Sequence, residues 1–192
     1  SAMPTDHPLN VGMVGMHGNY GPNVLTNECD VLIALGMRFD DRVTGNLATY
    51  AKQAKVIHFE IDSAEVDKNV KTTVAVLADL KESLTALLPL IEKNSHESWH
   101  NEFKEKYKIE LEAVINDELK PKKEGISMGE TIEMINKHSK GDAIMVSDVG
   151  QHQMFTCRYS KFNQTKSNIT SGGLGTMGFA LPAAIGAKMG MP

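Results

Sequence analysis

Residues 30–45 read DVLIALGMRFDDRVTG and join a short apolar run to a turn that is rich in charge and glycine. The apolar run at residues 31–35 has the length and β-branched content of a strand that is covered on both faces of a parallel sheet. Open α/β sheets bind ligands in the loops after the carboxyl ends of their strands. Because residues 36–45 carry two arginines and two aspartates between flanking glycines, the stretch predicts both a fold class and a binding site.

Strand-like runs alternate with helical patterns along the rest of the chain. Two helix starts have a capping residue followed three positions later by glutamate, at Asp79 with Glu82 and at Ser127 with Glu130. Alternation of strand and helix predicts an α/β fold with parallel sheets. The expected strands are residues 31–35, 56–61, 74–77 and 143–146.

Residues 94–125 differ from their surroundings because they are densely and evenly charged. Their widely spaced aromatic and aliphatic side chains predict a partly exposed helix, which breaks at the polar stretch 120–125. We therefore expect a first domain over residues 1–92, a connecting helix and linker over 93–126, and a second domain over 127–192. The chain starts without an initiator Met and stops after a helical pattern, so we expect it to be an internal fragment.

Composition excludes several classes of protein. The formal net charge of -4 argues against a nucleic-acid partner. No stretch approaches the roughly 20 apolar residues of a membrane span, and the amino end has no signal-peptide pattern. Two cysteines far apart in the sequence fit a reducing compartment, so we expect a cytoplasmic protein.

Residues 96–100, HESWH, match the short pattern in which two histidines and a glutamate on one helical face form a zinc peptidase site. Such a short pattern often arises by chance, and its neighbours here are solvated charges. A surface helix is the simpler interpretation, and metal analysis distinguishes the two.

Three glycine-spaced stretches are candidates for cofactor loops: residues 12–18 (GMVGMHG), 148–154 (DVGQHQM) and 173–178 (GLGTMG). The last has the spacing of a dinucleotide fingerprint, in which glycines let the backbone approach a pyrophosphate at a helix start. Its late position also suits a glycine turn that packs a helix against a sheet. Each pattern is weak by itself.

In this order and spacing, residues 16–18, 36–45, 149–154 and 171–178 together resemble the catalytic subunits of the acetolactate synthase family. The likeness covers almost the whole chain. It implies parallel-sheet three-layer sandwiches: the later part of a middle FAD-binding domain and the start of a carboxy-terminal domain that binds thiamine diphosphate and Mg²⁺.

The resemblance also implies a reaction. Members of the family decarboxylate pyruvate and join the two-carbon unit to a second 2-oxo acid, which gives 2-acetolactate or 2-aceto-2-hydroxybutyrate in branched-chain amino-acid biosynthesis. They work as homo-oligomers, and a small regulatory subunit is a possible partner. The activating glutamate and the metal ligands would lie outside these residues, so we expect the isolated chain to be inactive.

Site residues follow from the same resemblance. Arg42 matches the arginine that recognises the carboxylate of the second substrate, a task suited to a planar bidentate donor. Met177 matches the apolar residue beneath thiamine diphosphate that keeps the cofactor bent. The other thiamine-contacting positions are Gly150, Gln151, His152 and Gly175.

FAD in this family takes no part in net redox chemistry. Physically, Arg38 can face a phosphate and Glu60 can accept hydrogen bonds from ribose hydroxyls. The matching positions are Met16, His17, Gly36, Met37, Arg38, Asp40, Val43, Glu60, Ile61, Ala78 and Asp79, with Gln153, Gly172 and Gly173 from the next domain.

Two other functions remain open besides the zinc peptidase. A sister thiamine enzyme, such as an oxo-acid oxidase or decarboxylase, shares the architecture, and a plain nucleotide-binding module would use the glycine loops without chemistry. An assay of acetolactate formation with and without FAD and thiamine diphosphate separates these possibilities.

Overall fold

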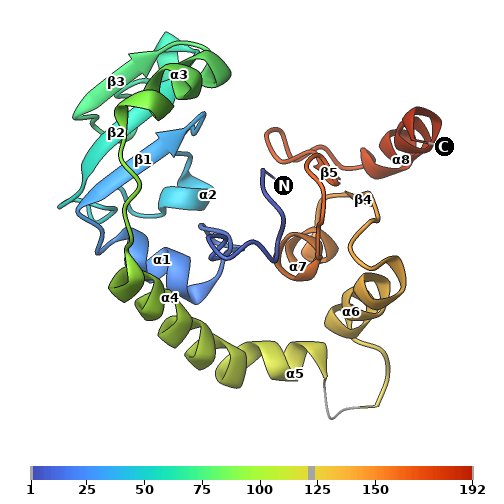
Figure 1. The fold of residues 1–192 in the computed structure, drawn as a ribbon. Coiled ribbons are helices and arrows are strands. Elements are labelled where there is room, and N and C mark those ends of the chain that lie inside the picture. The colour runs from blue at the N-terminus through green and yellow to red at the C-terminus, as the bar shows by residue number, and fades with distance from the viewer. Residues whose placement is uncertain (1, 121–123, 192) are drawn as a thin grey trace. The chain divides into compact units, whose positions relative to one another are not determined.

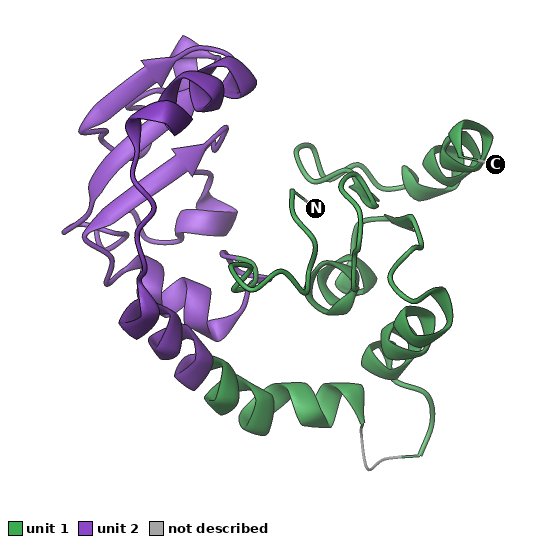
Figure 2. Ribbon diagram, viewed as in Figure 1, with its two compact units in different colours: residues 1–13, 107–192 green, residues 14–106 purple. Residues whose placement is uncertain are grey.

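A computed structural model describes residues 2–120 and 124–191. The chain divides into two compact units, one formed by Val14–Lys106 and the other by Ser1–Met13 with Tyr107–Pro192 (Figure 2). Each unit has its own parallel sheet (Figure 1). The α/β class with parallel strands that the alternating pattern predicts is therefore confirmed.

The sheet of the Val14–Lys106 unit has three strands in the order β1 (Val31–Leu35), β2 (Lys55–Glu60) and β3 (Val74–Leu77). β1 pairs in parallel with β2, and β2 pairs in parallel with β3. The predictions for residues 31–35 and 74–77 are confirmed to the residue, and β2 lies one residue earlier than residues 56–61. All three strands therefore end at the same edge of the sheet.

The expectation that β1 is covered on both faces is wrong for the described structure. Val31, Ile33 and Leu35 are 43%, 55% and 45% exposed, whereas Ala34 is buried. Side chains alternate between the two faces of a strand, so the three exposed residues share one face. The core packs only against the other face.

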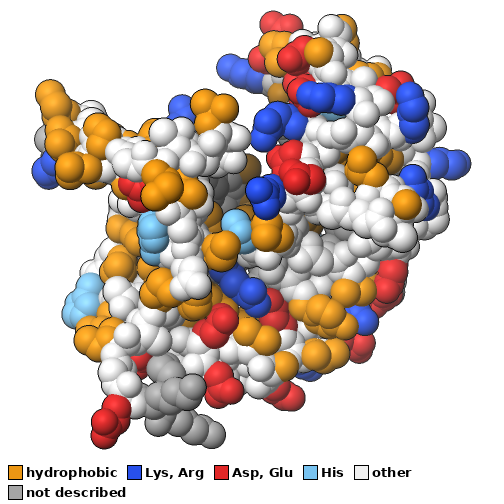
Figure 3. Space-filling view, turned by 180° about the vertical axis from the view of Figure 1, so that it is seen from behind, with side chains coloured by type: hydrophobic (Ala, Val, Ile, Leu, Met, Phe, Trp, Pro, Cys, Tyr) orange, Lys and Arg blue, Asp and Glu red, His pale blue; other side chains and the backbone are white. Residues whose placement is uncertain are grey.

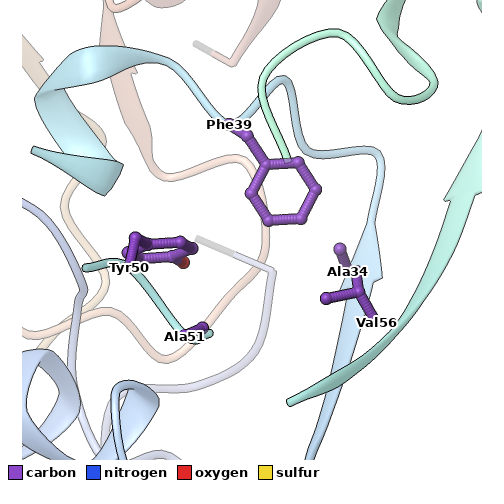
Figure 4. Close-up of a cluster of buried hydrophobic side chains, with 5 residues drawn as sticks. All are labelled: Ala34, Phe39, Tyr50, Ala51 and Val56. Carbon is purple, nitrogen blue, oxygen red and sulfur yellow. The ribbon is translucent and has the colours of Figure 1, made fainter. Parts of the chain in front are cut away.

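A cluster of buried side chains covers that inner face: Ala34, Phe39, Tyr50, Ala51 and Val56. Figure 4 shows the ring of Phe39 between Tyr50 and Ala51 on one side and Ala34 and Val56 on the other. The rings of Phe39 and Tyr50 meet edge to face, with 6.3 Å between their centroids. Phe39 belongs to the turn after β1, so the core holds this turn against the sheet.

Short helices surround this sheet. The Asp79 carboxylate accepts hydrogen bonds from the amides of Lys81 and Glu82, so Asp79 caps α3 as its sequence predicts. The helical elements of the unit, before the long helix described next, are α1 (Tyr20–Thr26), α2 (Asp41–Thr44), η1 (Ser63–Glu65), α3 (Leu80–Leu87) and η2 (Leu88–Leu90).

A long helical run crosses the boundary between the units. It consists of α4 (Glu97–Glu110), the π-helical segment η3 (Leu111–Ile115) and α5 (Asn116–Leu119). The helix predicted within residues 94–125 is confirmed, and it ends at Leu119. Residues 121–123 of the predicted break at 120–125 lie outside the described residues. The boundaries predicted at residues 92 and 127 stay a prediction.

The second unit contains α6 (Met128–Ser139), β4 (Met145–Ser147), α7 (Gln151–Tyr159), β5 (Asn168–Thr170) and α8 (Ala180–Gly190). Ser127 and Glu130 form the predicted capping box at the start of α6. Ile115, Ile132 and Tyr159 form the core of this unit. The strand predicted at 143–146 lies at 145–147, and the hydropathy pattern does not predict its parallel partner β5.

The last helix is strongly apolar yet lies open to solvent. Leu181 is 74% exposed and Met189 is 79% exposed. Figure 3 shows hydrophobic side chains gathered over this helix, at the upper left of the view.

Candidate functional site

The FAD positions predicted in the Val14–Lys106 unit gather mainly at the carboxyl edge of its sheet. Residues 36–45 follow β1, Glu60 and Ile61 end or follow β2, and Ala78 and Asp79 follow β3. The Gly36 amide donates to the Phe59 carbonyl at 2.8 Å, and the Ala78 amide donates to the Glu60 carbonyl at 3.1 Å. These hydrogen bonds extend the pairing of β1 with β2 and of β2 with β3 into the turns. Parallel pairing therefore brings the turns after the three strands together.

Within the turn after β1, Asp40 organises the backbone and the charges. One carboxylate oxygen accepts from the Arg42 amide at 3.0 Å and caps α2. The other oxygen pairs with the Arg38 guanidinium at 3.2 Å. The Arg38 side chain is 53% exposed, so its remaining donors are open to an anionic group.

Phe39 anchors the same turn, although the sequence alone does not single it out. Its φ of 52° lies in the left-handed region, which costs a non-glycine residue about 1 kcal/mol or more. Burial of its ring and a hydrogen bond from the Asn69 side chain, whose Nδ2 donates to the Phe39 carbonyl, stabilise this conformation. The neighbouring Arg38 and Asp40 therefore stay toward solvent while Phe39 faces the core.

A pocket of about 270 Å³ lies beside α2. The predicted residues Met16, Arg42 and Val43 line it, together with Val14, Gly15, Asn23, Thr26, Asn27, Asp41, Thr44, Gly45 and Tyr50. Burial raises the pKa of Tyr50. His17 precedes the buried Gly18, and its own side chain is partly buried.

Backbone contacts hold the glycine loop against the arginine turn. The Met16 amide donates to the Arg42 carbonyl at 2.8 Å, and the Asn23 amide side chain bonds both the amide and the carbonyl of Gly15. A Cβ on Gly15 would lie 2.8 Å from the Arg42 carbonyl oxygen, and the Gly15 φ is 98°. Only glycine permits this approach.

Glu60 is buried beside a histidine. One carboxylate oxygen accepts from the amides of Ile61 and Asp62 at 2.8 and 3.1 Å. The other oxygen lies 3.8 Å from Nε2 of His58, which is fully buried and packs edge to face on Phe39. Ile61 is 71% exposed, and the use of Glu60 as a ribose acceptor stays a prediction.

In the second unit, the thiamine positions likewise follow the ends of parallel strands. β4 leads into residues 148–152, and β5 leads into residues 171–178. Gly150 precedes α7 with a φ of 150°, and a Cβ there would meet the His152 ring at 3.0 Å. Gln151 and His152 are exposed, and Gln153 donates to the Thr170 hydroxyl at 2.8 Å.

Asp148 joins these two turns, a role that its sequence position hints at without revealing. Its carboxylate accepts from the amides of Val149, Gly178 and Ala180 at 2.8, 3.0 and 3.2 Å. These amide hydrogen bonds lower the pKa of Asp148. Gly172, Gly173, Gly175 and Met177 lie in or next to the turn that it holds, and Met177 is 80% exposed.

The described residues fit the two cofactors that the sequence predicts. No side chain caps the start of α7 among residues 2–120 and 124–191, and phosphate groups bind such free amides. Gly36 has open space where a Cβ would stand, so a flavin dinucleotide can approach this turn beside Arg38. Gln153, Gly172 and Gly173 belong to the other unit, and their contact with the same flavin stays a prediction.

A zinc peptidase site finds no support in the described ranges. His96 precedes α4 and His100 lies in its first turns, as expected for a surface helix. No group of three or more His, Cys, Asp or Glu side chains within residues 2–120 and 124–191 is placed to hold a metal ion. No helix in the same ranges has both the length and the apolarity needed to cross a bilayer.

Comparison with known proteins gives matches along almost the whole chain. Residues 1–87 match the thiamine pyrophosphate enzyme central domain, and residues 148–192 match the C-terminal TPP binding domain. The acetolactate synthase large subunit of Lactococcus lactis is 46% identical over 99% of this chain and 32% of its own length. The isozyme 3 large subunit of Escherichia coli is 40% identical over 100% of this chain and 34% of its own length.

A probable acetolactate synthase large subunit of Methanocaldococcus jannaschii is 42% identical over 98% of this chain and 33% of its own length. The chain thus spans about a third of the length of the curated relatives that it matches. It belongs to the thiamine pyrophosphate enzymes, with a segment of their central domain and a segment of their C-terminal domain.

Proposed function

We propose that these 192 residues are the segment of an acetolactate synthase that recognises the second 2-oxo acid, binds FAD and supplies part of the thiamine diphosphate site. The observation that carries this proposal is the 46% identity to an acetolactate synthase along 99% of the chain. Two sets of turns at the carboxyl ends of parallel strands support it, because ligands of α/β proteins bind there.

Arg42 is the residue that we assign to the acceptor substrate. Its side chain lines the pocket beside Met16, with Nη1 3.8 Å from the Met16 sulfur, and no carboxylate pairs with it among the described residues. A guanidinium in this state offers two parallel donors to the carboxylate of a 2-oxo acid. The apolar Met16 and Val43 beside it suit the short alkyl group of pyruvate or 2-oxobutyrate.

The second unit holds the thiamine positions. When bound, thiamine diphosphate accepts the electron pair that pyruvate releases as it loses carbon dioxide. The free amides at the start of α7 suit its diphosphate, and Met177 is exposed enough to contact its rings. In this proposal Mg²⁺ would accompany the diphosphate through ligands that these residues do not supply.

The proposal also covers the position of FAD, the domain boundaries and the assembly of the enzyme. FAD would lie along residues 36–45, 60–61 and 78–79 of a middle domain covering residues 1–92, and the second domain would begin at residue 127. We expect a homo-oligomeric cytoplasmic enzyme with a possible small regulatory subunit.

A chimera tests the function. The 192 residues replace the matching third of the Lactococcus lactis enzyme, and 2-acetolactate formed from pyruvate is measured with and without thiamine diphosphate and FAD. We expect formation that needs both cofactors, with the unmodified Lactococcus enzyme as positive control.

Other outcomes of this assay contradict the proposal in different ways. An assembled chimera that consumes pyruvate but releases only acetaldehyde or acetate indicates a sister thiamine enzyme. An assembled chimera that binds FAD without any turnover of pyruvate indicates a nucleotide-binding module.

A further inference from the structure

Asp148 holds two separate turns with one carboxylate. Through Oδ1 it accepts from the Val149 amide at 2.8 Å and from the Gly178 amide at 3.0 Å, and through Oδ2 it accepts from the Ala180 amide at 3.2 Å. Val149 begins the turn that leads to Gln151 and His152, whereas Gly178 follows Met177. Gly178 lies thirty residues after Asp148 in sequence, with α7 and β5 between them.

The carboxylate also serves helix α8. The residue before α8, Phe179, makes no side-chain cap, and Ala180 is the first residue of the helix. Asp148 therefore supplies the negative charge that a helix N-terminus favours, from a distant part of the chain. It caps α8 and positions the turn before it.

Met177 depends on this arrangement because its own side chain is 80% exposed. Its backbone is fixed on both sides: the Thr176 amide donates to the Ser171 hydroxyl at 3.0 Å, and the Gly178 amide donates to Asp148. Gly178, the next residue, has a φ of 82°, a left-handed conformation that glycine adopts readily. Without the bond to Asp148, one of the two anchors of Met177 is lost.

We propose that Asp148 is a positioning residue that fixes the Met177 turn relative to the 150–152 turn, so that both are ordered before thiamine diphosphate binds. The effect on the cofactor rests on the proposed function, whereas the link between the turns does not. A cofactor that meets ordered turns does not have to order them itself, which raises its affinity.

The first test uses the 192-residue chain by itself. Hydrogen exchange of the Gly178 and Ala180 amides is followed by NMR in the wild type, Asp148→Ala and Asp148→Asn. We expect roughly tenfold faster exchange in Asp148→Ala, since hydrogen bonds to a charged group contribute about that factor, and a smaller increase in Asp148→Asn, which keeps one acceptor oxygen.

Asp142→Ala is the matched control. Asp142 precedes β4, at the end of the strand opposite to Asp148, and its carboxylate accepts from the Asn163 side chain at 3.1 Å. Its removal takes away one carboxylate from the same unit, so we expect the Gly178 and Ala180 amides to exchange at the wild-type rate. Unchanged exchange in both Asp148 variants would overturn the proposal.

The second test uses the chimera. We expect Asp148→Ala to raise the concentration of thiamine diphosphate that gives half-maximal acetolactate formation by roughly tenfold, with Asp142→Ala unchanged. A mere loss of folded enzyme lowers the maximal rate and leaves the half-saturating concentration where it was. Should Asp148→Ala fail to fold, Asp148→Asn gives the same comparison.

The two tests separate this proposal from the proposed function. The Gly178 and Ala180 amides of Asp148→Ala could exchange faster while the half-saturating concentration of thiamine diphosphate stays at the wild-type value. That result would overturn the positioning role and leave the proposed acetolactate synthase activity standing. A wild-type chimera without activity would count against the proposed function, and amide exchange in the isolated chain would still decide whether Asp148 links the turns.

Discussion

Arg42 is the residue on which substrate choice depends in this proposal. It follows the first residue of the four-residue helix α2, whose cap Asp40 fixes the Arg42 backbone, and its side chain lines the pocket. The backbone amide of Arg42 thus helps to order the turn, while its guanidinium stays available to a ligand.

Arg42→Lys in the chimera should weaken joining to the second 2-oxo acid more than loss of carbon dioxide. An ammonium cannot make the paired bonds of a guanidinium, so we expect the ratio of 2-acetolactate formed to carbon dioxide released to fall about tenfold. Arg38→Lys, in the same turn, should change the affinity for FAD instead. An Arg42→Lys enzyme with unaltered product ratio and acceptor preference would contradict the assignment.

Gly15→Ala should destabilise the chain by about 3 kcal/mol, because strain at positive φ adds to a collision with the Arg42 carbonyl. Gly45→Ala is the matched comparison. Gly45 has a φ of 58° and nothing within 4 Å of an added Cβ, so it carries strain without collision. We expect a loss of about 1–2 kcal/mol there. Equal free energies of unfolding for the two variants in urea would refute the close approach.

Protonation of Asp148 should release the turn that it holds. Hydrogen bonds from backbone amides lower the pKa of Asp148 in the folded chain below its ordinary value near 3.9. The ionised carboxylate therefore stabilises the folded chain fully above that ordinary value. This stabilisation is lost as the pH falls through the lowered folded-state value. The NMR shifts of the Gly178 and Ala180 amides should therefore inflect below about pH 3.9, and an inflection at or above that pH would show that the bonds are weak.

At the scale of elements, α6 depends on its capping box. The Ser127 hydroxyl accepts from the Glu130 amide at 3.1 Å and donates to the Glu118 carbonyl at 3.2 Å, so it joins α6 to the end of α5. Ile132 of the same helix belongs to the buried core of the unit, together with Ile115 and Tyr159.

Ser127→Ala should lower the free energy of unfolding by about 1–2 kcal/mol, since both the cap and the bond to Glu118 are lost. Ser127→Thr keeps a hydroxyl and should stay within about 0.5 kcal/mol of the wild type. Urea denaturation followed by circular dichroism measures both variants. Similar losses for Ala and Thr would mean that the hydroxyl contributes nothing.

At the scale of the whole molecule, each unit has a small parallel sheet, of three strands in one unit and two in the other. The three strands of one unit and the two of the other place most of the candidate turns at a carboxyl edge, whereas the loop with Met16 and His17 precedes β1. Both β1 and α8 leave apolar side chains in solvent. The chain also spans only about a third of its curated relatives.

The 192 residues by themselves should form no 2-acetolactate from pyruvate, even with thiamine diphosphate, Mg²⁺ and FAD at millimolar concentration. In the proposal, the groups that activate the cofactor and bind the metal come from other parts of the enzyme. The chimera, assayed in parallel, is the positive control. Acetolactate formed by the isolated chain above the rate without protein would refute this expectation.

The amino-acid sequence by itself determined the local elements. Apolar runs of β-branched residues set β1, β2 and β3 to within a residue, and the capping residues Asp79 and Ser127 set the starts of α3 and α6. These signals are local, since they depend on side-chain alternation and on backbone amides within one turn. The residues of the turns, in their order and spacing, resemble the acetolactate synthase family, and the matches of residues 1–87 and 148–192 to thiamine pyrophosphate enzyme domains agree with that resemblance.

Only the tertiary structure decided which distant residues support the turns. Phe39 faces the core with a positive φ and packs against the buried ring of His58, and Asp148 accepts from the Gly178 amide thirty residues away. β5 has only one apolar residue, Ile169, and its place in the sheet comes from pairing with β4. Such contacts join segments that are far apart in sequence, so no local pattern records them, and they arise only when parallel strands bring their carboxyl ends to one edge.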